Sequence, residues 1–219
     1  MKIQILTSKN SWLFKNKKKD IVNTLKKYSK KVNLLNEYRR LKKNFDITII
    51  VSYYKRIPQK YLFFSKHNLV VHESDLPQGR GWSPLYRQIM RGKNKIMFTL
   101  FECSNGIDAG RYYYKKKFFF KENLVYSELK EFQLLNALFL IKKFLNYYKK
   151  NNTSPKRIAQ KGKSSYFKKI SKLDSKININ QSLKSQFNRL RTIDNENFPA
   201  FFYYKKRKFF IKIEPSYHK

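Results

Sequence analysis

The sequence predicts an α/β fold in which a mainly parallel sheet is flanked by helices. Short apolar runs that suit strands alternate with stretches of helical periodicity, and this alternation favours parallel strands joined by helices. The run Asp46–Ser52 (DITIIVS) is rich in β-branched residues, as in a strand that is buried on both faces of a sheet. A length of 219 residues, 41% of them hydrophobic, suits one compact domain with a small appendage.

The strands of this sheet are expected in the N-terminal half. Their predicted ranges are Lys2–Thr7, Val32–Leu35, Asp46–Ser52, Asn68–His72 and Lys95–Glu102, with a further strand beginning in Gly110–Tyr114. A lysine-rich helix is predicted over Asn16–Lys31, where apolar residues recur at helical spacing. Ligands bind beyond the carboxyl ends of the strands in sheets of this kind, and His72 falls at one such end.

The clearest helix follows at Tyr126–Lys149, where leucine and phenylalanine residues form an apolar stripe that ends before Asn151–Pro155. The sequence therefore predicts a main domain over residues 1–150. The remaining residues, 151–219, are expected to form a smaller extension.

Within this extension, the basic and serine-rich segment Lys156–Lys176 is expected to be irregular. Asn180–Arg191 is predicted to form a short capped helix. The aromatic runs Phe198–Tyr204 and Lys208–Ile213 predict two strands of a β-hairpin. Such a hairpin exposes apolar area, so we also expect that it joins a homodimer interface.

The formal net charge of +36 is extreme and favours an anionic partner. The lysines are spread along the whole chain beside many Asn, Ile, Phe and Tyr residues, which AT-rich codons favour, so base composition explains much of the excess. It explains the scarcity of Asp and Glu less well. Nucleic acid or another polyanion therefore stays open as a partner, and a phosphorylated substrate would also benefit from a positive field.

The cysteine and histidine content excludes some classes of site. Cys103 is the single cysteine, which excludes an internal disulfide and a cysteine-rich metal site. The three histidines form no cluster with metal-ligand spacing, so no metal is predicted. The most apolar run, Leu134–Leu145, is interrupted by Lys142 and Lys143 and is shorter than the roughly 18 residues of a membrane span. No secretory signal is visible, and we expect a cytoplasmic protein without membrane insertion.

Gly, Pro and Ser residues gather between His72 and Pro84, as in a functional loop at the end of a rigid strand. His72 follows an apolar triplet and is expected to face a cleft. Asp108 comes about 36 residues later, in a turn flanked by glycines. A histidine and a carboxylate form a recurrent acid–base pair, because the carboxylate orients the ring and stabilises its cation. Spacing alone leaves a purely structural role open for both residues.

The motifs around His72 and Asp108 favour a catalytic role over a purely structural one. They are His72-x-Ser74-x-Leu76-Pro77, then Arg80-Gly81 and Pro84, and finally Asp108-Ala109-Gly110. In their order and gaps they resemble the formyltransferases that use 10-formyltetrahydrofolate. The resemblance implies a Rossmann-like catalytic domain over residues 1–150, with His72 and Asp108 as catalytic residues. The family's third catalytic group, an asparagine two residues before the histidine, is replaced here by Val70.

The resemblance also implies a mechanism of acyl transfer, in which a neutral amine attacks the formyl carbon of the folate. His72 would donate a hydrogen bond to the oxyanion or handle the proton that leaves the amine, and Asp108 would hold His72. Val70 removes one expected donor, a loss of about 3 kcal/mol if nothing replaces it. Ser74, a backbone N–H or water could substitute. The resemblance therefore supports the reaction class more firmly than full activity.

Two loops would line the folate pocket by the same resemblance. The loop after Asp46–Ser52 contributes Tyr54, which stands where the family usually has glycine, and Ile57. The opposite wall would consist of Glu102, Asn105 and Ile107. On the acceptor side, the residues expected to bind substrate are Ser74, Arg80, Gly81 and Trp82.

The acceptor is an amine whose identity the sequence indicates less strongly. The segment Asn188–Phe202 resembles the stretch that follows the catalytic domain in sugar and methionyl-tRNA formyltransferases. The few residues after Pro199 do not suffice for the β-barrel domain of the methionyl-tRNA enzymes. The sequence around His72 and Trp82 is most similar to that of sugar N-formyltransferases. A nucleotide-linked amino sugar of surface-polysaccharide biosynthesis is therefore the expected acceptor. The alternatives are another amine, such as methionyl-tRNA, and a non-catalytic basic member of the family that binds nucleic acid or another polyanion.

Overall fold

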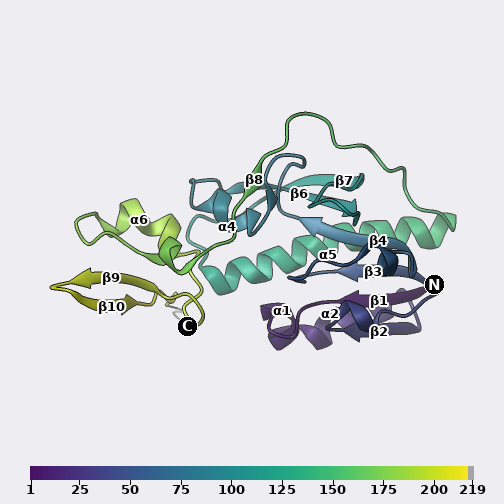
Figure 1. Ribbon diagram of the computed structural model, residues 1–219, viewed down its shortest axis with the longest axis horizontal. Coiled ribbons are helices and arrows are strands. Elements are labelled where there is room, and N and C mark those ends of the chain that lie inside the picture. The colour runs from purple at the N-terminus through teal and green to yellow at the C-terminus, as the bar shows by residue number, and fades with distance from the viewer. Residues whose placement is uncertain (217–219) are drawn as a thin grey trace.

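A six-stranded sheet forms the centre of the protein, for which the computed structural model describes residues 1–216 (Figure 1). The strand order is β2-β1-β3-β4-β6-β7. The strands are β1 (Lys2–Leu6), β2 (Lys31–Leu35), β3 (Phe45–Ile50), β4 (Ser65–His72), β6 (Lys95–Glu102) and β7 (Tyr112–Phe119). The first four in this order are parallel, whereas β6 runs antiparallel to β4, and β7 antiparallel to β6. The predicted Rossmann-like α/β class is confirmed.

Helices cover both faces of the sheet. On one face, α1 (Trp12–Asn16), α2 (Lys18–Lys26), α4 (Pro84–Ile89) and the long α5 (Tyr126–Asn151) share one apolar core with the strands. On the other face, the short helices η1 (Tyr38–Arg40) and α3 (Gln59–Leu62) pack over a second cluster around Leu6 and Ile50. Residues on both faces of β1 and β3 are buried, as the β-branched run in β3 predicts.

Three parts of the chain differ from the prediction. The segment Lys156–Lys176, expected to be irregular, contains a short strand at Tyr166–Phe167 and a short helix at Lys172–Ser175. The helix predicted over Asn16–Lys31 is split, because Lys17 has φ −129° and interrupts the helical backbone between α1 and α2. The strand expected to begin in Gly110–Tyr114 runs to Phe119 as β7, although it contains three consecutive lysines. A lysine run fits a strand at the sheet edge, where side chains reach water and the backbone still pairs with β6.

The C-terminal extension contacts the main domain and also has a small core of its own. Its elements are β8 (Tyr166–Phe167), η2 (Lys172–Ser175), α6 (Leu183–Leu190) and the antiparallel strands β9 (Ala200–Tyr204) and β10 (Arg207–Ile211). Strand β8 pairs with the short β5 (Arg80–Gly81). The buried residues Ile177, Leu190, Ile193 and Ala200 hold the extension together.

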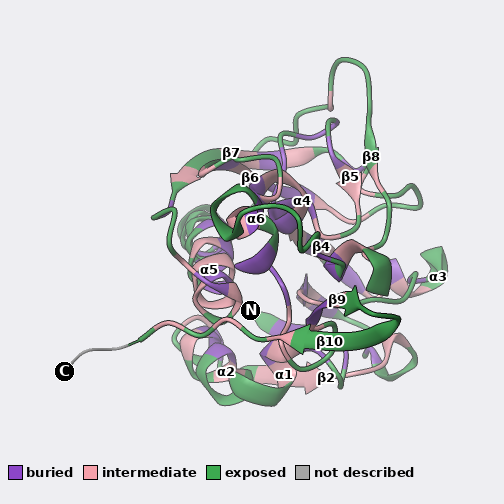
Figure 2. Cartoon of the chain, turned by 90° about the vertical axis from the view of Figure 1, so that its left-hand side faces the viewer, coloured by how far each residue is buried: buried purple, intermediate pink, exposed green. Residues whose placement is uncertain are grey.

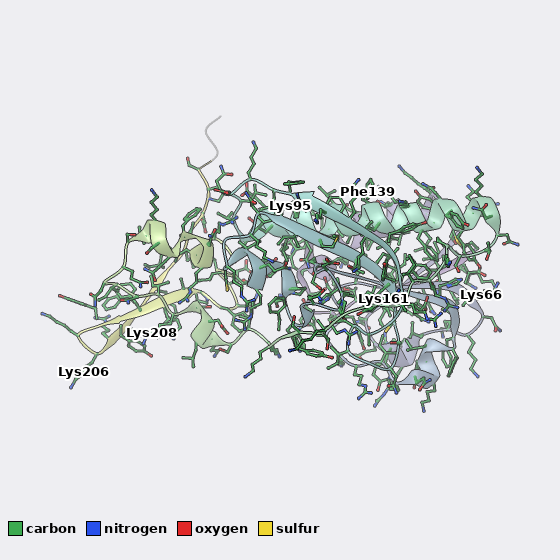
Figure 3. All side chains as sticks on the ribbon, turned by 90° about the horizontal axis from the view of Figure 1, so that it is seen from above. Lys66, Lys95, Phe139, Lys161, Lys206 and Lys208 are labelled. Atoms are coloured by element: carbon green, nitrogen blue, oxygen red, sulfur yellow. The ribbon has the colours of Figure 1, made fainter. Side chains whose placement is uncertain are left out.

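The C-terminal strands confirm the predicted hairpin, which projects from one end of the molecule (Figure 1). Figure 2 shows that most of β9 and β10 is exposed, in contrast to the buried strands of the sheet. Lys206 and Lys208 extend from this hairpin and Lys66 lies near the opposite end, so positive charge is present at both ends (Figure 3). Homodimer formation through the hairpin stays a prediction. Within residues 1–216, no helix combines the length and apolarity needed to cross a membrane.

Candidate active site

His72 is the last residue of β4, and its imidazole is buried at the carboxyl end of the parallel strands. Its Nε2 atom lies 2.8 Å from the carbonyl oxygen of Gly79. Because a carbonyl only accepts hydrogen bonds, Nε2 carries a proton and donates it to Gly79. The other ring nitrogen, Nδ1, lies 3.7 Å from Oδ2 of Asp108. The strand end and the glycine-flanked loop therefore bring the two sequence-predicted residues together, with Nδ1 as the nitrogen that faces the carboxylate.

The carboxylate of Asp108 is held by the loop that follows β4. The backbone N–H of Gly81 donates to Asp108 Oδ2 at 2.8 Å. Gly81 has φ +94°, and a Cβ atom there would lie 2.6 Å from the carbonyl oxygen of Phe167. Only glycine adopts this backbone without strain and leaves that space free. Asp108 itself has φ +46°, so its loop depends on such contacts to keep a left-handed conformation.

The loop between His72 and Gly81 is attached to the sheet at several points. The Thr99 hydroxyl donates to the Ser74 carbonyl at 2.7 Å. Lys115 on β7 donates to the Asp75 carboxylate at 2.6 Å and to the carbonyl of Leu76 at 2.5 Å. Leu76 is fully buried. The loop that carries Gly79 and Gly81 is therefore well supported, and so is the contact of Gly79 with His72.

The position at which the family has its catalytic asparagine lies on β4. Val70 lies on β4 between Ile50 on β3 and Phe101 on β6, and it offers no hydrogen-bond donor from its side chain. Asn68 lies two residues further back and is buried, with its Nδ2 group donating to the carbonyl of Leu62 at 2.8 Å. The Nδ2 end of that amide is thus used within the fold, four residues away from His72, while Oδ1 is buried with no hydrogen-bond partner within residues 1–216.

The five residues predicted to line a folate pocket divide into two groups. Tyr54 and Ile107 are exposed, and Asn105 accepts from the guanidinium of Arg56 at 2.8 Å, which joins the loops after β3 and β6. Ile57 is buried in the second apolar cluster.

Glu102, the fifth of these residues, faces the protein itself. Its carboxylate accepts from the backbone N–H of Asn68 and from the Tyr113 hydroxyl, both at 2.5 Å, and lies 3.6 Å from Nδ1 of His67. This carboxylate is occupied by internal partners.

The four predicted acceptor-side residues lie along one loop. Ser74 is 2% exposed, and its hydroxyl has no hydrogen-bond partner within residues 1–216. Gly81 donates its N–H to Asp108. Trp82 is exposed, its ring centroid lies 6.4 Å from that of Tyr54, and the ammonium of Lys169 lies 5.0 Å above its ring. The fourth, Arg80, makes its hydrogen bonds to residues of the C-terminal extension.

Several residues near the site carry no sequence signal. Glu73 is buried beside His72 and accepts from the Gln133 side chain at 2.8 Å, and its burial raises the pKa of its carboxyl group. Lys130 lies 5.1 Å from the ring of Tyr86 and 5.3 Å from that of Tyr126, and burial lowers the pKa of its amine. Gln160 contacts the Asp108 loop from the segment expected to be irregular. Glu73 is next to His72 in the sequence, whereas Lys130 and Gln160 belong to no local motif and only the fold brings them to the site.

The sequence of this chain is similar to that of a known enzyme family. The model of the formyl transferase family matches residues 4–131, which is more than half of the chain. The methionyl-tRNA formyltransferase of Orientia tsutsugamushi is 31% identical over 138 residues, which are 63% of this chain and 44% of that protein. The chain thus spans about half the length of the relatives that it matches in sequence.

Three solved structures share the fold. Methionyl-tRNA formyltransferase from Clostridium thermocellum has a TM-score of 0.78 and 21% identity, and the match covers 99% of this chain and 94% of that one. A 4-N formyltransferase from Francisella tularensis has a TM-score of 0.72 and 15% identity, with 99% of each chain covered. HypX from Aquifex aeolicus, solved with tetrahydrofolic acid, has a TM-score of 0.73 and 16% identity over 97% of this chain and 37% of that chain.

Proposed function

This chain belongs to the formyl transferase family, and on that premise we propose that it is an N-formyltransferase. In this proposal, it transfers the formyl group of 10-formyltetrahydrofolate to the amine of a nucleotide-linked amino sugar. The observation that carries the proposal is the placement of His72 Nδ1 at 3.7 Å from Asp108 Oδ2 at the end of a parallel strand, with the Gly81 N–H on the carboxylate. A family motif without this geometry would not support acid–base chemistry.

The chemistry needs a base and a donor to the oxyanion. The lone pair of a neutral amine attacks the formyl carbon, and the carbonyl electrons move to oxygen. The tetrahedral species then collapses, the bond from carbon to N10 of the folate breaks, the amine loses a proton and N10 gains one. Because His72 Nε2 donates to Gly79, the proton from the amine passes to Nδ1 of His72 and then across the 3.7 Å gap to Asp108 Oδ2. Gly81 keeps the carboxylate turned toward that gap.

The oxyanion needs a donor that Val70 does not supply. The hydroxyl of Ser74 is the side-chain candidate, because it is buried two residues after His72 and has no partner within the described part of the chain. An unpaired buried hydroxyl is costly, so an incoming oxygen atom would be stabilised there. In this proposal Ser74 takes over part of the role of the asparagine.

The formyl donor fits the exposed residues of the two loops. Tyr54 and Ile107 offer apolar surface, and Arg56 and Asn105 bridge the loops beside them with polar groups. A flat pterin with a ring of donors and acceptors suits such a mixture. Ile57 would hold the loop after β3 through the second apolar cluster, and Glu102 would act by fixing the start of the loop after β6 rather than by contact with the folate.

The acceptor side favours an anionic substrate. Neither Arg80 nor Lys169 forms an ion pair within residues 1–216, so both keep their charge beside Trp82. Trp82 offers a flat face of the kind that stacks on a nucleobase. Two phosphates and a base in one acceptor match these groups. The fold does not choose between acceptors, because the 4-N formyltransferase from Francisella tularensis and the methionyl-tRNA formyltransferase from Clostridium thermocellum both match nearly the whole chain.

A second acceptor is favoured by a different observation. Methionyl-tRNA formyltransferases are among the sequence relatives, and the net charge of +36 would suit tRNA. The test is a coupled assay with 10-formyltetrahydrofolate and two sets of acceptors, namely UDP- and dTDP-linked amino sugars and methionyl-tRNA. Release of tetrahydrofolate with an amino sugar supports the proposal, and release with methionyl-tRNA alone supports the second candidate. No release with any acceptor, together with no pterin binding, overturns both.

A further inference from the structure

Gln160 connects the two sides of the candidate active site. It lies in the segment between α5 and β8, 52 residues beyond Asp108 and 80 beyond Arg80, and is half-buried. Its side-chain amide makes four hydrogen bonds to three residues of the site. An amide has a donor end and an acceptor end, and here each end serves a different part of the site.

The donor end holds the loop of Asp108. The Nε2 group of Gln160 donates to the carbonyl of Asp108 at 2.7 Å and to that of Gly110 at 2.8 Å. These bonds span the left-handed backbone of Asp108, which has φ +46°. A left-handed aspartate persists only when its surroundings impose it. Gln160 thus helps to set the direction from which the Asp108 carboxylate approaches Gly81 and His72.

The acceptor end holds Arg80 without neutralising it. The Oε1 atom of Gln160 accepts from Arg80 Nη2 at 2.6 Å and from Nε at 3.3 Å, and the Tyr166 hydroxyl lies 3.3 Å from Nη1. Both partners are neutral groups. No ion pair within residues 1–216 includes Arg80. Arg80 is therefore fixed in place and keeps a full positive charge, which suits recognition of a phosphate.

We propose that Gln160 is a positioning residue that couples an anion subsite at Arg80 to the carboxylate of Asp108. The inference rests on the proposed function and deepens it, because it names a phosphate of the acceptor as the group that Arg80 binds. When a phosphate engages Arg80, the same amide that orients Arg80 also holds the Asp108 loop in its working position. Binding of the phosphorylated end and alignment of the reacting end then depend on one side chain.

The test compares three substitutions of similar size. Gln160→Met removes both ends of the amide. Arg80→Gln removes the cation and its hydrogen bonds to Gln160 Oε1 and Tyr166, and it leaves the donor end of Gln160 in place on the Asp108 loop. Gln78→Met is the matched control, because exposed Gln78 joins the same two chain segments through Lys163, at 3.2 Å, without touching Asp108 or Arg80. Gln160→Glu is a fourth variant for the case that Gln160→Met fails to fold. In this variant the glutamate carboxylate still accepts from Arg80, but it also neutralises the charge of Arg80. It has no N–H group to donate to the Asp108 loop.

Two measurements do not require turnover. In a protein labelled with ¹⁵N-glycine, we expect the Gly81 amide proton to resonate at low field, because it donates to the Asp108 carboxylate at 2.8 Å. We expect it to move upfield in Gln160→Met and in Gln160→Glu, but not in Arg80→Gln or Gln78→Met. Inorganic pyrophosphate, titrated by calorimetry, should bind about tenfold more weakly to the Gln160 and Arg80 variants and unchanged to Gln78→Met.

Steady-state kinetics distinguishes the role of the acceptor end of Gln160 from that of its donor end. Arg80→Gln should raise the acceptor KM about tenfold and leave kcat within about twofold, whereas Gln160→Met should raise KM and also lower kcat about tenfold or more. An unmoved Gly81 resonance in Gln160→Met, or undiminished pyrophosphate binding in Arg80→Gln, overturns the inference. If the wild type formylates none of the acceptors, the proposed function fails instead, and the resonance and pyrophosphate measurements still decide on Gln160.

Discussion

The Nε2 atom of His72 donates to the carbonyl oxygen of Gly79 across 2.8 Å. This bond fixes which ring nitrogen is available for chemistry. A histidine whose Nε2 pointed into the cleft would be oriented by a carboxylate at Nδ1, as in many acid–base pairs. Here a backbone carbonyl takes that orienting role, and Asp108 shares the reacting side of the ring.

The first prediction concerns the charge of that carboxylate. Asp108→Asn preserves the shape and can still accept from Gly81, but it cannot take a proton, so kcat should fall by about 10² to 10⁴. The KM for the folate should stay within about threefold. Tetrahydrofolate release measures both constants. The control is Asp20→Asn, because Asp20 lies exposed on α2, far along the chain from the site. Near-normal kcat in Asp108→Asn would remove Asp108 from the chemistry.

The second prediction concerns the family asparagine. Val70→Asn introduces an amide donor on β4, two residues before His72. If the oxyanion lacks a donor, kcat should rise, by up to about 10². Ser74→Ala in the wild-type background should lower kcat by a similar factor if the Ser74 hydroxyl is the substitute donor. A Val70→Asn enzyme that is no faster would mean that the oxyanion is already fully stabilised.

The third prediction concerns a glycine that tolerates no side chain. A Cβ atom on Gly110 would lie 1.6 Å from the carbonyl oxygen of Glu102, and backbone must move to relieve that contact. Gly110→Ala should therefore lower the free energy of unfolding by about 4 kcal/mol or more. Gly92→Ala is the comparison, because its Cβ would meet nothing closer than 3.9 Å and its φ of +81° alone costs about 1–2 kcal/mol. Equal losses in urea unfolding would contradict the steric argument.

The fourth prediction uses the single cysteine. Burial raises the pKa of the Cys103 thiol to about 12, with a further contribution from the charge of Glu102. At pH 8 only about one thiol in ten thousand is then ionised, and the thiolate is the reactive form. Iodoacetamide should leave the folded protein unmodified for hours and label it within minutes in 6 M guanidinium. Mass spectrometry gives the labelled fraction, and rapid labelling of the folded protein would contradict the raised pKa of the half-buried Cys103 thiol.

The fifth prediction follows from the contact of Arg87 with Asp174, which joins α4 to the C-terminal extension at 2.8 Å. Burial by itself would raise the pKa of Asp174, but the N–H of Ser171 and the side chain of Arg87 lower it overall. A carboxyl whose folded pKa is depressed stabilises the fold above its unfolded value of about 3.9 and loses this effect as the pH falls below that value.

Asp174→Asn should therefore lower the free energy of unfolding by about 1–2 kcal/mol at pH 7. The difference from the wild type should shrink toward zero between about pH 4 and pH 2. Urea unfolding at several pH values measures it, with Asp20→Asn as an exposed control. A difference that grows as the pH falls would contradict this sign.

The sequence predicts those parts of the fold that depend on local pattern. The β-branched run in β3 and the apolar stripe of α5 each mark their own element, because burial on the sheet selects residues of one kind. The break at Lys17 is not visible in the sequence, since lysine is a good helix former and its type gives no sign of the φ of −129° that separates α1 from α2. The length of β7 is hidden for a similar reason, because pairing with β6 extends a lysine-rich segment that has no strand signal of its own.

The candidate site divides in the same way. His72 and Asp108 are found from motifs, and the fold brings them together. The orientation of the ring depends on the Gly79 carbonyl, which no residue type encodes. Gln160 escapes detection because a glutamine in a basic, irregular segment has no pattern around it, and its partners lie 50 or more residues away.

The pairing of β5 with β8 limits where recombination between related genes can cut this chain. Phe167 fills the space that a side chain on Gly79 would need, and its carbonyl oxygen occupies the space beside Gly81. A recombination event near residue 150 would separate these glycines from the phenylalanine against which they pack. We therefore expect functional recombinants with related genes to have their crossovers outside residues 79–167. The loop with Gly79 and Gly81 and the segment with Phe167 would then be inherited together.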